Sequence, residues 1–198
     1  NGSEDGLKEH LLPGLSPNGV PKTLRDTVFP FRYNDFDGLQ TLINENNIGV
    51  IKMEVVRNMG PENGFLQKVR KLATDHGIVL IFDECTSGFR EAFGGIHMNY
   101  DVEPDIAMFG KAIGNGYAIT AVLGRRNIME SAQSSFISST FWTERIGPTA
   151  AIKTLEIMER EQTWDTITRN GAIIRNGIQS IADKHKLQIT SWGLLALT

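Results

Sequence analysis

The chain has 198 residues, of which 20 are basic and 23 are acidic, so its formal net charge is −3 at pH 7. This balance leaves no basic stripe of the kind that a phosphate backbone requires, and we expect no nucleic acid as a partner. No apolar run reaches the roughly 20 residues that span a bilayer, and the start "NGSEDGLKEH" lacks the pattern of a signal peptide, so we expect a cytoplasmic protein with no membrane contact. The histidines are too scattered for a zinc site, and no metal is expected.

The first half of the chain divides into a loop and a regular part. Residues 1–40 are rich in Gly, Pro and Asn and show no sustained period, which is typical of a long ordered loop. "GVIKMEVV" (49–56) and "IVLIF" (78–82) are short apolar runs that predict strands, and "FLQKVRKLATDH" (65–76) between them has apolar residues at helical spacing. This order predicts a βαβ unit.

The second half continues the alternation of strands and helices. "IAMF" (106–109) and "ITAVLG" (119–124) predict two more strands, and helices are expected over 147–161 and about 163–184. Continuously apolar strands separated by helices indicate a sheet covered on both faces. The predicted fold class is therefore α/β, with a mostly parallel sheet sandwiched by helices.

Two charged groups follow predicted strands directly. Asp83 and Glu84 come after "IVLIF", and Lys111 comes after "IAMF" and a glycine. Ligands of open α/β sheets bind beyond the carboxyl ends of the strands, so these positions are the first candidates for a site.

One cofactor can use a lysine and a carboxylate together. Pyridoxal 5′-phosphate has an aldehyde that a lysine captures as a Schiff base, and a pyridine nitrogen that a carboxylate keeps protonated. From the spacing alone, an ion pair between Asp83 and Lys111, or an exposed loop lysine, stays an open alternative.

Three longer strings carry a family resemblance. "GFLQKVRKLATDHGIVLIFDECTSGFR", "PDIAMFGKAIGNGYAITAVLGRR" and "SSTFWTERIGPTAAIKTLEIME" occur in this order. Together they resemble the class III aminotransferases, and within them the branch similar to glutamate-1-semialdehyde 2,1-aminomutase. The resemblance implies a fold-type-I enzyme that depends on pyridoxal phosphate.

The resemblance also implies roles for four residues. Lys111 would form the Schiff base and move the proton, and Asp83 would pair with the pyridinium nitrogen. Cys85 stands where the family usually has Val or Ile against the ring, and a buried structural thiol is favoured there over a nucleophile. Thr140 in "SSTFW" matches the threonine that holds the phosphate across a dimer interface, with an ordinary turn hydroxyl as the alternative.

Three further residues receive no firm role. For Arg90 three roles stay open: a cation that contacts the substrate, a structural cation, or an exposed arginine in an ion pair. Trp142 lines the site or belongs to the core. Glu54 sits where the family often has Glu-Pro, but Val55 replaces the proline, so we assign it none.

The resemblance sets the expected organisation and activity. Residues 1–160 would form a partial large domain that binds pyridoxal phosphate, and residues 161–198 would start a small C-terminal domain. We expect a homodimer with shared active sites that moves an amino group on an amino acid, an amino-acid semialdehyde or an amino-sugar precursor. The alternative is a non-catalytic relic or regulatory domain that keeps the fold without the cofactor.

Overall fold

The computed structural model describes residues 7–11, 14–56, 58–138, 140–141 and 143–189. The chain divides into two compact units, Asn1–Ile48 and Gly49–Thr198, which are described separately. The domain boundary expected between residues 160 and 161 stays a prediction.

The first unit contains a helix that the sequence analysis did not predict. Two 3₁₀ helices, η1 (Lys8–His10) and η2 (Lys22–Leu24), lie in the predicted loop, and α1 (Phe36–Glu45) follows them. The carboxylate of Asp35 caps α1, because its Oδ1 accepts a hydrogen bond from the Gly38 N–H at 3.0 Å. Such a cap satisfies one of the free N–H groups that every helix start leaves.

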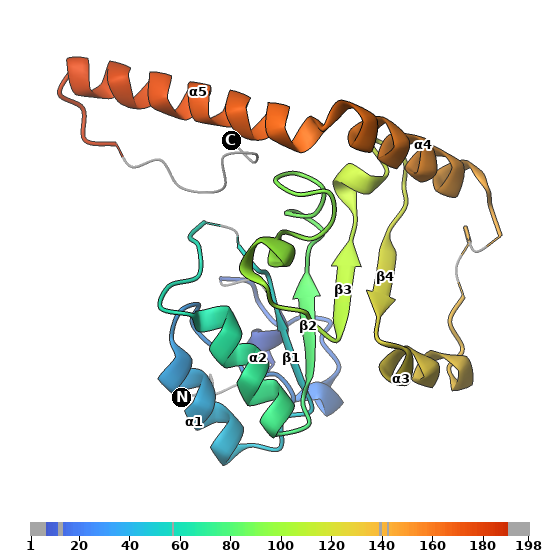
Figure 1. The fold of residues 1–198 in the computed structure, drawn as a ribbon. Coiled ribbons are helices and arrows are strands. Elements are labelled where there is room, and N and C mark those ends of the chain that lie inside the picture. Colours follow the sequence, from blue (N-terminus) through green and yellow to red (C-terminus); the bar gives the residue numbers. More distant parts are fainter. Residues whose placement is uncertain (1–6, 12–13, 57, 139, 142, 190–198) are drawn as a thin grey trace. The chain divides into compact units, whose positions relative to one another are not determined.

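The second unit is built on a four-stranded sheet in the order β1-β2-β3-β4 (Figure 1). Its strands are β1 (Val50–Met53), β2 (Val79–Asp83), β3 (Ile106–Phe109) and β4 (Ala121–Gly124). The first three strands are parallel, and β4 pairs with β3 in the antiparallel sense. The predicted fold class, α/β with a mostly parallel sheet, is confirmed.

Helix α2 (Phe65–Asp75) covers one face of this sheet. It connects β1 to β2 and packs on β2 as the crossover helix of the predicted βαβ unit. Its buried side chains recur at helical spacing, and the β2 side chains Leu80 and Phe82 are fully buried. Because side chains alternate along a strand, Ile81 and Asp83 point to the opposite face, where they are half-buried.

The remaining helices follow the strands in chain order. They are η3 (Ile96–Tyr100), η4 (Lys111–Ile113), α3 (Arg126–Met129), η5 (Glu130–Ser134), α4 (Ile146–Glu161) and α5 (Thr163–Lys184). The predicted helices over 147–161 and 163–184 correspond to α4 and α5, which meet at Gln162 in a left-handed backbone conformation (φ 48°). Within the described ranges, no helix is both long and apolar enough to cross a membrane.

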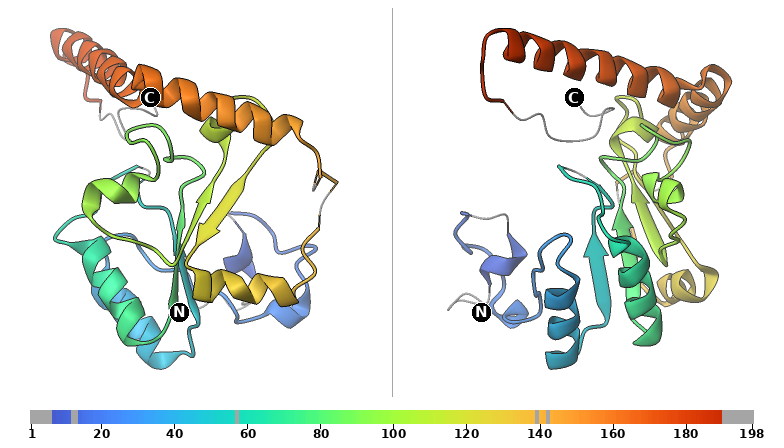
Figure 2. Two further views of the ribbon diagram at one scale, coloured as in Figure 1. Left: turned by 45° about the vertical axis from the view of Figure 1, so that its right-hand side comes forward. Right: turned by 60° about the vertical axis from the view of Figure 1, so that its left-hand side comes forward.

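A second part of the core lies where α4 reaches the sheet. Ala107 and Phe109 of β3, Ile113 of η4 and Ala151 of α4 are buried together, and Leu155 packs against them. Figure 2 shows α4 next to the segment that follows β3. Contacts with α4 therefore help to position the residues directly after β3.

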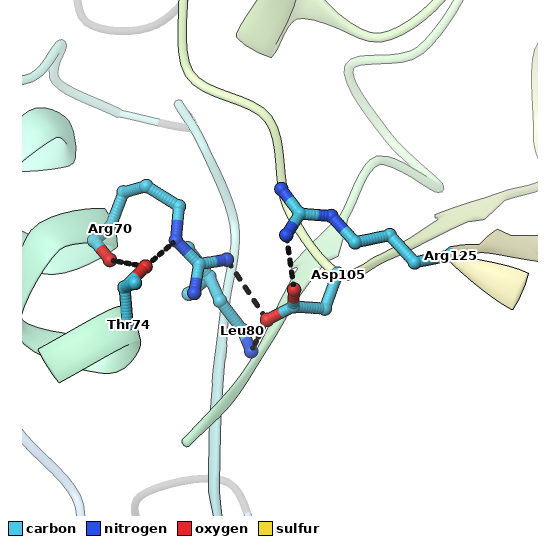
Figure 3. Close-up of polar contacts among 5 residues, drawn as sticks. All are labelled: Arg70, Thr74, Leu80, Asp105 and Arg125. Carbon is cyan, nitrogen blue, oxygen red and sulfur yellow. Dashed lines mark hydrogen bonds and ion pairs between the residues drawn. The ribbon is translucent and has the colours of Figure 1, made fainter. Parts of the chain in front are cut away.

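The buried carboxylate of Asp105 joins four segments at the amino end of β3 (Figure 3). Its Oδ2 accepts hydrogen bonds from the Leu80 N–H at 2.8 Å and from the guanidinium of Arg70 at 2.9 Å. Its Oδ1 lies 3.3 Å from a guanidinium nitrogen of Arg125, beyond β4. The Arg70 Nε also donates to Thr74 Oγ1 at 3.1 Å, within α2. One side chain thus links α2, β2, β3 and the end of β4.

We predict that Asp105→Asn strongly destabilises the protein. The substitution leaves the partly buried Arg70 guanidinium without its anion, and breaking such a pair costs about 3 kcal/mol. We expect the urea midpoint to fall by about 1 M or more. The control is Asp75→Asn, which breaks the exposed Lys71–Asp75 pair and should change stability by less than about 0.5 kcal/mol. Equal, small shifts in both variants would contradict the prediction.

The contribution of Asp105 should also depend on pH. Burial raises the pKa of Asp105, but the hydrogen bonds from Leu80 and Arg70 and the charges of both arginines outweigh it and bring the pKa below its ordinary 3.8. A carboxylate whose folded pKa is lowered stabilises the protein above its unfolded pKa and loses this effect as the pH falls through the folded pKa. In urea titrations, the wild type should therefore lose its advantage over Asp105→Asn below pH 3.8. An advantage that stays constant in acid would be inconsistent with this assignment.

Candidate active site

Asp83 is the last residue of β2, at the carboxyl edge of the sheet. Its Oδ2 accepts a hydrogen bond from Lys52 Nζ at 2.8 Å, and its Oδ1 accepts one from the Cys85 N–H at 3.1 Å. Burial raises the pKa of Asp83, but these two donors outweigh the burial, and the pKa lies below its ordinary value. Asp83 is therefore an anion at neutral pH.

Lys111 follows β3 after one glycine and is the first residue of η4. Its Nζ donates a hydrogen bond to Thr86 Oγ1 at 2.8 Å. Its backbone is left-handed (φ 47°), a conformation that costs a residue with a Cβ roughly 1–2 kcal/mol. The ion pair with Asp83 that the spacing left open is not formed, because Asp83 pairs with Lys52 and Lys111 with Thr86.

The parallel pairing of β2 with β3 brings the two candidate residues to one edge. Asp83 is in register with Met108, and the Glu84 N–H donates to the Met108 carbonyl oxygen at 2.8 Å. Lys111 is the third residue after Met108 and lies just beyond the end of β3. The carboxyl ends of parallel strands meet at the same edge, so both side chains emerge there.

Cys85 is half-buried next to the residues around Lys111. A Cβ built at Gly110 would lie 3.4 Å from Cys85 Sγ and 3.5 Å from Thr120 Cγ2, so a larger side chain at position 110 would fill the space beside the thiol. Burial raises the pKa of the Cys85 thiol, and the hydrogen bond and negative charge of Asp83 raise it further. A protonated thiol is a small, soft apolar group and a poor nucleophile.

A buried carboxylate, that of Glu84, holds the turn that carries Cys85 and Thr86. Glu84 is fully buried and accepts hydrogen bonds from the Ser87 hydroxyl, from the His97 N–H at 3.0 Å and from His97 Nδ1 at 2.8 Å. The Nε of Arg90 donates to the Thr86 carbonyl oxygen at 2.8 Å. Arg90 thus supports the backbone beside the hydroxyl that Lys111 contacts.

Of the two remaining candidates near α4, the structure describes Thr140 but not Trp142. Thr140 lies in an exposed turn ahead of α4, and among the described residues no hydrogen bond or ion pair joins it to Asp83, Cys85 or Lys111. Trp142 lies outside the described residues. The structure therefore assembles three of the four predicted site residues, and the role of Thr140 stays a prediction.

The sequence analysis missed two residues that contact the candidate pair. Lys52 stands in the apolar run "GVIKMEVV", and an ammonium group there is a signal that a partner must be near. Thr86 is the third residue after Asp83, in the turn at the strand end. The register of β1 determines that Lys52 contacts Asp83, and the conformation of the turn determines that Thr86 contacts Lys111.

The four side chains at this edge fit pyridoxal phosphate. Lys111 offers an amine for an aldehyde, and Asp83 offers an ionised carboxylate for a protonated ring nitrogen. The Cys85 thiol offers a flat ring a soft apolar contact, and Thr86 offers a hydroxyl beside the amine. Gly110 leaves space between the cysteine and the lysine segment.

Comparisons with known proteins agree with this fit. A family model described as aminotransferase class III matches residues 37–196. The 3-aminobutyryl-CoA aminotransferase of Cloacimonas acidaminovorans (strain Evry) is 35% identical over 88% of this chain and 44% of its own length. The glutamate-1-semialdehyde 2,1-aminomutase of Methanothrix thermoacetophila is 36% identical over 100% of this chain and 49% of its own length. The chain thus spans about half the length of these curated relatives.

Solved structures show the same fold. The PLP internal aldimine form of the Sphingopyxis sp. MTA144 FumI protein matches with a TM-score of 0.84 and 26% identity, over 96% of this chain and 47% of that one. An omega-transaminase from Sphaerobacter thermophilus matches with a TM-score of 0.79 and 26% identity, over 89% and 43%. The resemblance and the cofactor predicted from the sequence are confirmed: the chain belongs to the class III aminotransferases, a family whose cofactor is pyridoxal phosphate.

Proposed function

We propose that this chain forms part of a pyridoxal-phosphate-dependent enzyme that moves an amino group, with Lys111 as the residue that binds the cofactor covalently. The observation that carries the proposal is the placement of the Lys111 amine and the ionised Asp83 at one edge of the sheet. Pyridoxal phosphate, when bound, supplies an aldehyde for amines and a ring that withdraws electrons from the carbon next to the captured nitrogen.

Lys111 acts as the amine that holds the cofactor and as the base that moves a proton at the substrate carbon. Its hydrogen bond to Thr86 fixes the direction of the Nζ, and η4 fixes its backbone. Strained backbone conformations persist where the surrounding structure enforces them, and they cluster at active sites. The left-handed conformation of Lys111, next to the buried Gly110 and Ile113, is of this kind.

Asp83 and Cys85 act on the ring. The Asp83 carboxylate would accept a hydrogen bond from the protonated ring nitrogen and stabilise its positive charge. The protonated Cys85 thiol would offer the ring a soft apolar contact and would not compete for the aldehyde, because its raised pKa keeps it neutral.

The working unit in this proposal is a homodimer in which Thr140 serves the partner's site. Thr140 is exposed, and within the described part of the chain no hydrogen bond or ion pair joins it to Asp83, Cys85 or Lys111, which supports a role outside its own site. In a two-fold symmetric dimer each chain contributes the same surface to its partner. A threonine that each chain supplies to the other therefore completes two equivalent sites.

The proposed substrates are small amino donors and acceptors. One curated relative is named for 3-aminobutyryl-CoA, and the other is named for an amino-acid semialdehyde. For this protein we propose an amino acid, an amino-acid semialdehyde or an amino-sugar precursor. A panel of amino donors, read by the change in cofactor absorbance when the amino group is taken up, tests this choice.

We predict that Lys111→Ala abolishes turnover and the visible absorbance of the bound cofactor, because the Schiff base has no other amine at this position. The wild type should lose the same absorbance on reduction with borohydride. Lys71→Ala, which removes an exposed lysine of α2, is the control and should keep both activity and absorbance. Substantial activity in Lys111→Ala would refute the assignment, and a wild type without the absorbance would favour the non-catalytic alternative.

We predict that Thr140 acts across the dimer. Lys111→Ala chains alone should be inactive, and Thr140→Ala chains alone should be weakly active. In a mixed dimer, one site receives an intact lysine from one chain and an intact threonine from the other, so co-expression should restore activity above that of either variant. If Thr140→Ala is defective and mixing restores nothing, the threonine acts within its own chain.

A further inference from the structure

Lys52 is a charged residue of β1 that the proposed function does not use. We propose, on the basis of that proposed function, that Lys52 is a positioning residue that keeps Asp83 ionised and oriented, ready to receive the ring nitrogen of the cofactor. The proposal rests on the geometry of β1 and β2 at the carboxyl edge of the sheet.

The register of β1 and β2 places the two side chains together. Lys52 is in register with Ile81, and Asp83 is two residues further along β2 on the same face. Such diagonal neighbours are within reach of a long side chain. The Lys52 Nζ lies 2.8 Å from Asp83 Oδ2, so the ammonium donates directly to the carboxylate.

The pair leaves Asp83 free to accept a further hydrogen bond. A carboxylate has about four acceptor positions, and three donors reach that of Asp83: Lys52 Nζ at Oδ2, the Cys85 N–H at Oδ1, and the Cys85 thiol. Lys52 therefore orients the carboxylate without using up its acceptor capacity. The Lys52 side chain is 54% exposed and that of Asp83 is 21% exposed, so the carboxylate is the more desolvated member of the pair.

Burial without a counter-charge would favour the neutral form of Asp83. Burial raises the pKa of this carboxyl, and Lys52 is the largest of the influences that lower it. Without the ammonium, only the N–H and the thiol of Cys85 would oppose the burial. We expect the pKa of Asp83 to rise in the absence of Lys52.

Other titratable groups come from the surrounding segments. They are Glu54, two residues beyond Lys52, Glu84 and Cys85 in the turn after β2, and Lys111 after β3. None of them is changed when Lys52 is replaced, so they do not account for a difference among Lys52 variants.

The test is the pH dependence of cofactor binding, measured by absorbance titration of the cofactor-free protein with pyridoxal phosphate. Three variants separate charge from hydrogen bonding: Lys52→Met removes both, Lys52→Gln keeps a donor without the charge, and Lys52→Arg keeps both. A raised pKa means that Asp83 is protonated at mildly acid pH, where it can no longer stabilise a protonated ring nitrogen. We therefore expect Lys52→Met and Lys52→Gln to bind pyridoxal phosphate severalfold more weakly than the wild type at the acid end of the titration and to match it near neutrality. Lys52→Arg should match the wild type throughout.

Each other outcome has a defined meaning. If the Met and Gln variants bind as tightly as the wild type at acid pH, Lys52 does not control Asp83. If all three variants lose affinity equally at every pH, Lys52 contributes shape and not charge, which also overturns the proposal. If the wild type forms no absorbing complex that depends on Lys111, the proposed function fails, and the role of Lys52 that rests on it fails with it.

Discussion

The parallel pairing of β2 with β3 is the constraint on which the candidate site depends. The bond from the Glu84 N–H to the Met108 carbonyl oxygen extends this pairing one residue beyond β2. Because of it, Asp83 and the segment that starts at Lys111 leave the sheet at the same edge. A register shift of one residue would turn Asp83 to the face covered by α2 and separate it from both Lys52 and the open edge.

Two buried carboxylates stabilise this pairing from opposite ends of β2. At the amino end, Asp105 accepts the Leu80 N–H and the Arg70 guanidinium, and so ties β3 to β2 and α2. At the carboxyl end, Glu84 accepts from Ser87 and His97 and fixes the turn that carries the Thr86 hydroxyl. Fully satisfied buried polar groups favour one arrangement over its competitors, because any other arrangement leaves them without partners.

Much of this arrangement could be predicted from the sequence. The apolar runs around "IVLIF" and "IAMF" gave β2 and β3 their positions, and the charged residues directly after them marked the edge where Asp83 and Lys111 meet. Helix α1 was missed because its apolar residues fall in a segment rich in Asn and Gly, where only the Asp35 cap signalled a start. The partner of Asp83 was missed because it depends on the register of β1, which local patterns do not determine.

The assignment of Lys111 as the residue that binds the cofactor can be tested chemically. The protein is reduced with borohydride in the presence of pyridoxal phosphate and digested, and the pyridoxyl group is located by mass spectrometry. We expect a stable adduct on Lys111 and an unmodified Lys52, although both ammonium groups lie at the same edge of the sheet. An adduct on Lys52 or on a surface lysine, with Lys111 unmodified, would contradict it.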